Sequence, residues 1–323
     1  MVMNTELITD TSKRGASKHN AGHKRIMRKI WDQKVLYAMM LPGIIWYIVY
    51  RYAPMAGLIL GFKDFNFKAG IFGSKYVGLL YFRFIFFESA DFWQILRNTL
   101  LINIYKLIFS FPAPIVLAVM INGIRNKRLQ KVIQTSVYLP HFVSWVVFGS
   151  IVMQFLSLSG SINSLLKHIG IESIYFMTTP KYFRGILVAS DIWKTMGWNS
   201  IVFLAAITGI DPSMYEASTI DGCGKIKQVF YITIPSISET IIIMLLLTIG
   251  RLMDANFDQV YVMYNSVVMD VGDVISTYVY RIGIGKSRFS LTTAVGLFQS
   301  VVGLVLIGMA NATTRKLFDK SIW

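Results

Sequence analysis

The stretch Glu216-Ala217-Ser218-Thr219-Ile220-Asp221-Gly222, followed by Ile232-Thr233-Ile234-Pro235, lies between two long apolar segments. Just before it, Asp211 can cap a helix and Pro212 suits the first turn, where the missing N–H of proline costs nothing. Gly222 can adopt the left-handed conformation that ends a helix. Pro235 can open the next long helix. These residues therefore predict a rigid helix-turn-helix knob between two apolar segments.

The spacing of these residues resembles the EAA loop of bacterial ABC-importer permeases. The family pattern is Glu-Ala-Ala, three residues, Gly, nine residues and Ile-x-Leu-Pro, and this sequence departs from it conservatively at Ser218 and Ile234. In that family the loop docks into an ATPase partner. The alternative interpretation is an ordinary loop between two membrane spans. The residues expected to couple to the ATPase are Tyr215, Glu216, Ala217, Ser218, Asp221, Gly222 and Pro235.

The composition is that of a membrane protein. Of 323 residues, 54% are hydrophobic and only 15% are charged, and the mean hydropathy is +0.53. A soluble protein of this size could not hide so much apolar surface. The net charge of +15 would also suit nucleic acid, but the charges cluster at the ends of apolar segments, so nucleic acid is not expected. The lone Cys223 excludes an internal disulfide and is interpreted as a small side chain in the loop.

About six apolar segments are long enough to cross a bilayer, which takes roughly 20 helical residues. The sequence therefore predicts an all-α polytopic membrane protein with about six transmembrane helices. The first segment is not expected to be a cleaved signal peptide, because it begins late and no small-residue cleavage site follows it. The segments lie near residues 35–52, 99–121, 132–156, 185–210, 237–262 and 292–312.

Lys and Arg predict the orientation of the chain. They cluster in the N-terminal tail, in the turn at 125–131, in the loop at 225–227 and after residue 314. All four regions share one side if six spans alternate, and the positive-inside rule makes that side cytoplasmic. The expected organisation is a basic cytoplasmic N-terminal tail over residues 1–34, a permease domain over 35–315 with the coupling loop at 211–235, and a cytoplasmic C-terminal tail over 316–323.

Signatures of catalysis and of metal binding are missing from the sequence. Gly283-Ile284-Gly285-Lys286-Ser287 looks like the end of a P-loop, but Tyr280 stands where the motif requires an earlier Gly. Four scattered His and one Cys give no zinc-ligand spacing. We therefore expect no catalytic residues, no metal and no cofactor in this chain, with ATP and Mg²⁺ bound by partner ATPase subunits.

Polar residues in the fifth apolar segment suggest a path for a solute, because ionisable groups at membrane depth are costly and usually face a cavity. The apolar run 241–249 is followed by Arg251, Asp254 and Asp258. Their spacing of three and four would put them on one face of a helix. Such a shortened apolar run resembles the interrupted helices that transporters place around sites at the middle of the membrane.

The fourth apolar segment predicts a matching stripe made of Asp191, Lys194 and Trp198, with Asn199 beside it and Gly197 as a possible helix break. Lys106, in the second segment, could join the same polar chamber. The residues expected to line the substrate path are Lys106, Trp193, Lys194, Trp198, Asn199, Arg251, Asp254, Asn256 and Asp258.

Internal pairing is the alternative for these residues. Arg251 could pair with Asp254, and Lys194 with Asp191, holding helices together without touching a solute. The rings of Trp193 and Trp198 could pack in the core instead of stacking on a sugar. As a set the residues favour the chamber, since packing alone needs no charge at this depth.

The resemblance extends from about residue 36 to residue 312 and indicates the LplB-like branch of type I carbohydrate permeases. The motifs are Asn98-Thr99-Leu100, Tyr138-Leu139-Pro140-His141, Asn256-Phe257-Asp258-Gln259 and Thr293-Ala294-Val295-Gly296-Leu297-Phe298.

This branch imports complex oligosaccharides and includes permeases of alginate importers. An anionic uronide would suit Lys106, Lys194 and Arg251, although nearby acids could neutralise them. The implied fold is that of a type I ABC-importer permease in the bacterial inner membrane. The implied partners are a second, similar permease, two ABC ATPases, a solute-binding protein and the membrane lipid. The alternatives are a membrane enzyme acting on glycans or lipid-linked sugars, which would need a carboxylate or metal site, and a passive channel or scaffold, which would not need an ATPase knob.

Overall fold

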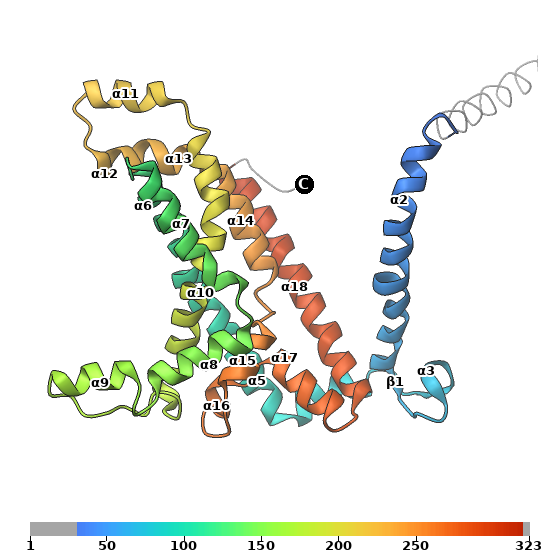
Figure 1. Ribbon diagram of the computed structural model, residues 1–323. Helices are drawn as coiled ribbons and strands as arrows, with labels where there is room; N and C mark the ends of the chain where they lie inside the picture. Colours follow the sequence, from blue (N-terminus) through green and yellow to red (C-terminus); the bar gives the residue numbers. More distant parts are fainter. Residues whose placement is uncertain (1–30, 319–323) are drawn as a thin grey trace, which may run out of the picture. The chain divides into compact units, whose positions relative to one another are not determined.

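The computed structural model describes residues 31–318, which are mostly helical (Figure 1). The all-α prediction is confirmed: within this range the strands are two short antiparallel segments, β1 (Lys63–Asp64) and β2 (Lys75–Tyr76). The chain divides into two compact units, Met1–Ile59 and Leu60–Trp323. Most of the predicted basic N-terminal tail, and the end of the C-terminal tail, lie outside the described residues.

The described part of the first unit begins with helix α2 (Lys34–Tyr47). A π-helical turn (Ile48–Tyr52) continues it, and a 3₁₀ segment (Ala53–Phe62) leads into the second unit. The helical path is therefore longer than the predicted first span, which was expected to end near residue 52.

The second unit holds the remaining elements. Its π-helical turns are Phe84–Glu88, Lys106–Ser110, Val229–Thr233 and Tyr280–Ile284. Its α-helices are α3 (Gly70–Gly73), α4 (Leu80–Arg83), α5 (Ala90–Tyr105), α6 (Pro112–Asn122), α7 (Lys127–Phe142), α8 (Trp145–Leu156), α9 (Ser161–His168), α10 (Pro180–Thr208), α11 (Pro212–Ile220), α12 (Lys225–Gln228), α13 (Ile234–Ser236), α14 (Ser238–Gly250), α15 (Phe257–Met263), α16 (Met269–Gly272), α17 (Ile275–Val279) and α18 (Phe289–Phe318).

Several helical stretches of the chain are long and apolar enough to cross a membrane. Among the described residues there are four, or five if one pair bent by 65° is a single span. Helix α10 has 29 residues, but its polar side chains make it less apolar than those four, so about six spans remains a prediction. The four stretches are Lys34–Phe62, Ala90–Asn122, Trp145–His168 and Phe289–Lys316, and the bent pair is Lys225–Ser236 with Ser238–Gly250.

Two of the predicted spans are interrupted. The third, 132–156, divides into α7 and α8, because α7 ends after Pro140 and Ser144 caps α8 through the backbone N–H of Val147. The fifth, 237–262, divides at Gly250, where α14 ends. Residues Arg251, Asp254 and Asp258 therefore do not share the face of one helix, and that part of the prediction is wrong.

Helix α10 lies at the centre of the second unit and packs against α6 and α7. It runs unbroken through Gly197, so this glycine is not the helix break that the sequence suggested. A methyl group at Gly197 would come within 1.9 Å of the carbonyl oxygen of Val137 on α7. Glycine is thus needed for close approach of the two helices.

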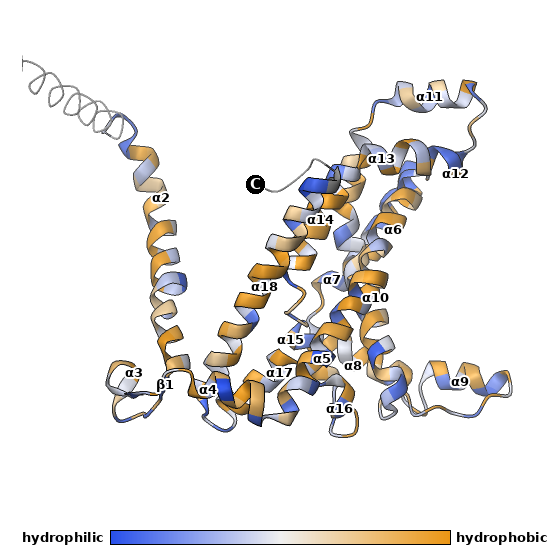
Figure 2. Ribbon diagram, turned by 180° about the vertical axis from the view of Figure 1, so that it is seen from behind, coloured by the Kyte–Doolittle hydropathy of each residue, from blue (hydrophilic) through white to orange (hydrophobic). Residues whose placement is uncertain are grey.

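The ribbon has the colours of hydrophobic residues along much of α14 and α18, α10 is mixed, and α12 has the colour of hydrophilic residues (Figure 2). Three clusters of buried apolar residues form the core. One joins α5, α17 and α18, one joins α8, α10 and α15, and one joins α6, α10 and α14. Apolar contacts therefore surround α10 on several sides, and its polar side chains are exceptions in a largely apolar environment.

Candidate functional site

The loop between α10 and α14 folds as a helical knob, as predicted. The Asp211 carboxylate accepts a hydrogen bond of 2.9 Å from the backbone N–H of Ser213 and caps α11. Because this bond favours the charged form, it lowers the pKa of Asp211. At the other end Gly222 has φ of +76°. Cys223 N–H bonds the carbonyl of Ser218, and Gly222 N–H bonds that of Thr219, which closes a Schellman motif.

Side-chain hydrogen bonds hold α11 onto the segment that follows it. The amide of Gln228 donates to Ser218 Oγ at 2.9 Å and to Thr219 Oγ1 at 3.0 Å. The hydroxyl groups of Tyr215 and Thr233 lie 2.9 Å apart. Tyr215 and Ser218 therefore face inward. Among the predicted coupling residues the exposed ones are Glu216, Ala217, Asp221, Gly222 and Pro235.

The knob also exposes large apolar side chains. Ile220 is 87% exposed, Ile226 77% and Tyr231 77%, and Met214 and Phe230 are exposed as well. The lysines of α12 border them, and this end of the molecule is more polar than the helices below it (Figure 2). An apolar patch rimmed by polar groups typically marks a protein-binding surface.

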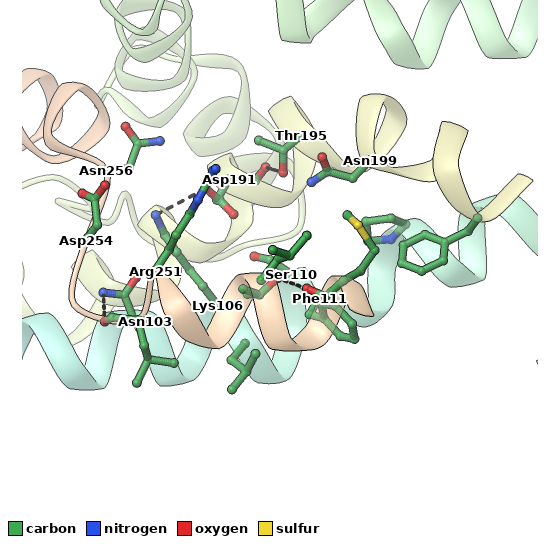
Figure 3. A pocket seen from close by; sticks show the side chains of 17 residues that line it. Asn103, Lys106, Ser110, Phe111, Asp191, Thr195, Asn199, Arg251, Asp254 and Asn256 are labelled. Carbon is green, nitrogen blue, oxygen red and sulfur yellow. Dashed lines mark hydrogen bonds and ion pairs between the residues drawn. The ribbon is translucent and has the colours of Figure 1, made fainter. Parts of the chain in front are cut away.

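Midway along the helices lies a cavity of about 360 Å³, bordered by α5, α6, α10, α14 and the segment after α14 (Figure 3). The apolar part of its wall comes from Phe111, Pro114, Phe203, Met244 and Leu247. Five of the predicted path residues line it: Lys106, Asn199, Arg251, Asp254 and Asn256. The other polar side chains of its wall are Asn103, Ser110, Asp191, Thr195 and Thr248.

Lys106 is the centre of a polar network in the wall of this cavity. Its Nζ lies 3.3 Å from Asp191 Oδ1 and donates a hydrogen bond of 2.5 Å to Gln259 Oε1. The fully buried Gln259 in turn donates to the carbonyl of Leu187 at 2.6 Å and to Ser190 Oγ at 2.9 Å. The network therefore ties the π-helical turn after α5 to α10 and α15, and Asp191 pairs with Lys106 and not with Lys194.

The unwound segment between α14 and α15 is fixed by side chains from distant helices. Asn103 on α5 donates to the carbonyl of Leu252 at 2.8 Å, and Gln299 on α18 donates to that of Met253 at 2.8 Å. Asn256 has φ of +51° and accepts from Gln259 N–H to cap α15. These bonds satisfy backbone groups that the broken helix leaves free, so Arg251 and Asp254 face the cavity from a loop.

Four of the predicted path residues do not line the cavity. Lys194 is only 5% exposed, and its Nζ donates to the carbonyls of Pro140, His141 and Val143 at the end of α7. Trp198 stacks on His141 at 4.6 Å, Trp193 packs against Phe148 and Phe155, and Asp258 lies exposed on α15.

The predicted stripe on α10 was therefore one residue out of register. Asp191, Thr195 and Asn199, spaced by four, face the cavity, whereas Lys194 and Trp198 face α7. Thr195 could have been found from the spacing of Asp191 and Asn199. Asn103 and Gln259 carried no comparable signal, because their partners are remote in the sequence. The charged groups of the cavity wall, Lys106, Arg251, Asp191 and Asp254, balance one another. Residues 31–318 contain no cluster of three His, Cys, Asp or Glu that could hold a metal.

Known proteins resemble this chain over most of its length. The family model described as "Binding-protein-dependent transport system inner membrane component" matches residues 110–319. The polygalacturonan/rhamnogalacturonan transport system permease protein YteP of Bacillus subtilis (strain 168) is 39% identical over 301 residues, covering 93% of this chain and 94% of that protein. Protein LplB of the same organism is 42% identical over 295 residues, with 91% and 92% covered.

A solved structure is also similar to this chain over most of its length. A chain of the bacterial alginate ABC transporter, crystallised in complex with an alginate pentasaccharide-bound periplasmic protein, superposes with a TM-score of 0.85 at 38% identity. The match covers 92% of this chain and 100% of that one.

Proposed function

Because this chain belongs to the family of binding-protein-dependent transport system inner membrane components, we propose that it is the membrane-spanning permease subunit of an ATP-driven oligosaccharide importer. It is a permease and not an enzyme, and ATP hydrolysis belongs to separate subunits. The alternatives of a glycan-processing membrane enzyme and of a passive channel are not favoured, since neither accounts for the likeness to sugar permeases.

One observation carries the proposal: a single helical unit holds both an exposed apolar knob and a polar cavity. The knob around α11–α13 lies at one end of α10, and the cavity lies further along the same helix (Figures 1 and 3). Movement of the knob can therefore reach the cavity through α10 and α14, which join at the knob. The coupling residues remain Tyr215, Glu216, Ala217, Ser218, Asp221, Gly222 and Pro235.

We place the knob on the cytoplasmic side of the bacterial inner membrane, with both termini, and the α16 end of the unit outside. The chain is a multi-pass membrane protein. The asymmetry of Lys and Arg supports this orientation. The partners proposed are a second, similar permease, two ABC ATPases that bind ATP and Mg²⁺, and an extracytoplasmic solute-binding protein.

The substrate is proposed to be an acidic oligosaccharide. Polygalacturonan and alginate, which appear in the names of two similar proteins, are polymers of uronic acids. The central cavity adds no net positive charge, because Asp191 and Asp254 offset Lys106 and Arg251. Its polar wall suits the hydroxyl groups of a sugar passing through, and recognition of the carboxylates is left to other surfaces.

Reconstitution tests this function directly. The chain is combined in liposomes with the proposed partner permease, ATPases and solute-binding protein, and ATP hydrolysis and sugar uptake are measured. We expect both to rise when the binding protein carries an oligosaccharide. The same liposomes lacking this chain are the control. Hydrolysis that no oligosaccharide stimulates, in a complex that assembles with this chain, would contradict the proposal.

A further inference from the structure

A stripe of polar residues continues along α10 beyond the central cavity, toward the end of the helix that we place outside. Lys181 and Arg184 precede Asp191, Thr195 and Asn199 at spacings that keep all five near one face of the helix. Arg184 lines two cavities near the start of α10, with volumes of about 470 Å³ and 590 Å³. The central cavity begins at Asp191.

The smaller of these outer cavities is basic. Arg97 from α5 and Arg184 from α10 both line it, together with Asp270 from α16. Within residues 31–318 neither arginine forms an ion pair, since the ion pairs there join Lys106 with Asp191 and Arg281 with Asp273. Two guanidinium groups at one cavity with a single carboxylate leave an excess of positive charge, which favours an anion.

The guanidinium of Arg184 is held in place before any ligand arrives. It donates to Asn98 Oδ1 at 2.8 Å and to the carbonyl of Val271 at 3.2 Å. The buried Asn98 is fixed in turn by hydrogen bonds to the carbonyls of Asp270 and Asp273. Arginine has five N–H donors, so the remaining ones can meet a carboxylate in a fixed orientation.

An aromatic ring completes the wall. Trp93 lines the same cavity and is 53% exposed, although its Nε1 is bound to the carbonyl of Phe86 at 3.1 Å. The ring therefore presents a fixed, open face. Gln94 beside it donates to the carbonyl of Asp270. The held guanidinium of Arg184 and the exposed Arg97, next to an aromatic face, match the two surfaces of a uronate residue, which has one anionic group and one apolar ring face.

We propose that Arg97, Arg184 and Trp93 form an outer subsite that takes a uronate residue of the oligosaccharide before the chain passes along α10 to the central cavity. This inference rests on the proposed function. Negative charge on the sugar would then be recognised at the outer end of α10, where cations exceed anions. The central cavity, whose charges balance, would bind the sugar only weakly as it passes.

Arg97→Gln is the test, because Arg97 is exposed and supports no hydrogen bond within the described residues, whereas Arg184 also holds Asn98. Arg83→Gln, an exposed arginine on α4 outside the cavities described, is the matched control. The reconstituted importer receives binding protein loaded with an oligouronate or with its carboxyl-reduced, neutral counterpart. The measured quantity is the concentration of loaded binding protein that gives half-maximal ATP hydrolysis.

We expect Arg97→Gln to raise this concentration roughly three- to tenfold for the oligouronate, because the substitution removes one partly exposed charge-assisted hydrogen bond to the carboxylate. The reduced sugar and Arg83→Gln should show no change. Trp93→Leu should raise the concentration for both sugars. An equal effect of Arg97→Gln on both sugars, or none on either, overturns the subsite.

Two further outcomes separate the possible causes. Repeating the assay in liposomes of phosphatidylcholine alone removes anionic lipid headgroups, and disappearance of the Arg97→Gln effect there would assign the arginines to lipid and overturn the subsite. Stimulation of the unsubstituted importer by neutral oligosaccharides only would overturn this inference and leave the importer function standing. Absence of stimulation by any oligosaccharide would instead contradict the proposed importer function.

Discussion

Lys194 and Arg251 show how two cations predicted for the same path can have different roles. Lys194 is buried and donates to the carbonyls of Pro140, His141 and Val143, where α7 ends. Arg251 is exposed to the central cavity and forms no ion pair with the described residues. A buried cation that satisfies helix-terminal carbonyls stabilises the fold, whereas an exposed one is free to meet a solute.

We therefore expect Lys194→Met and Arg251→Met to differ in which property they impair. Lys194→Met leaves buried carbonyls without a donor, each costing about 1–3 kcal/mol, so the yield of assembled complex and transport should fall together. Arg251→Met should lower transport at nearly normal yield. Yield by size-exclusion chromatography and uptake in liposomes are compared for both. A parallel loss of yield and transport in Arg251→Met would contradict its place on the substrate path.

Lys106 and Asp191 combine both roles, because they line the cavity and bind each other. Breaking a largely buried pair leaves a charge uncompensated, so Lys106→Met alone should lower the thermal stability of the complex. Adding Asp191→Asn should restore most of it, with a coupling energy of about 1–3 kcal/mol in a double-mutant cycle. Transport should stay low in the double variant. Full recovery of transport would mean that the pair only holds the π-helical turn after α5 to α10.

At the scale of elements, local signals predicted the knob but only part of the cavity wall. Asp211, Pro212 and Gly222 act on residues within one helical turn, so the sequence is enough to read the ends of α11. The unwinding after Gly250 depends on Asn103 and Gln299, which lie far along the chain from the carbonyls they bind. The face of α10 that meets α7 depends on packing at Gly197. Such long-range contacts carry no periodic signal, which explains why Lys194 and Trp198 were predicted in place of Thr195.

The two glycines that flank Cys223 give a controlled test of the knob. Gly222 has φ of +76°, and Gly224 has φ of −71°, with open space around both. A β-branched residue resists positive φ, at a cost of about 1–3 kcal/mol. Gly222→Val should therefore distort the end of α11 and abolish substrate-stimulated ATP hydrolysis in the assembled complex. Gly224→Val should retain most of it. Equal stimulation in the two variants would show that the geometry of this turn does not matter for coupling.

At the scale of the whole molecule, the two ends of the second unit differ in chemistry. The knob end carries exposed apolar residues and the lysines of α12, whereas the opposite end carries the arginine and tryptophan cavity beside α16. α10 connects them over 29 residues. If α10 moves as a rigid helix, closing of the proposed ATPase partners at the knob can shift the walls of the central cavity and of the proposed outer subsite without any change inside the helix itself.

This arrangement requires the knob to face the cytoplasm, which cysteine labelling can test. In a Cys223→Ser background, Asn126→Cys is placed at the start of α7 and Lys167→Cys on α9, both at exposed positions. A membrane-impermeant thiol reagent added outside intact spheroplasts should label position 167 and spare position 126, because Lys and Arg gather on the side of residue 126. Both positions should react once the membrane is permeabilised, which controls for accessibility. Labelling of position 126 in intact spheroplasts would reverse the orientation, remove the knob from the ATPases and place the arginine cavity on the wrong side to receive a sugar.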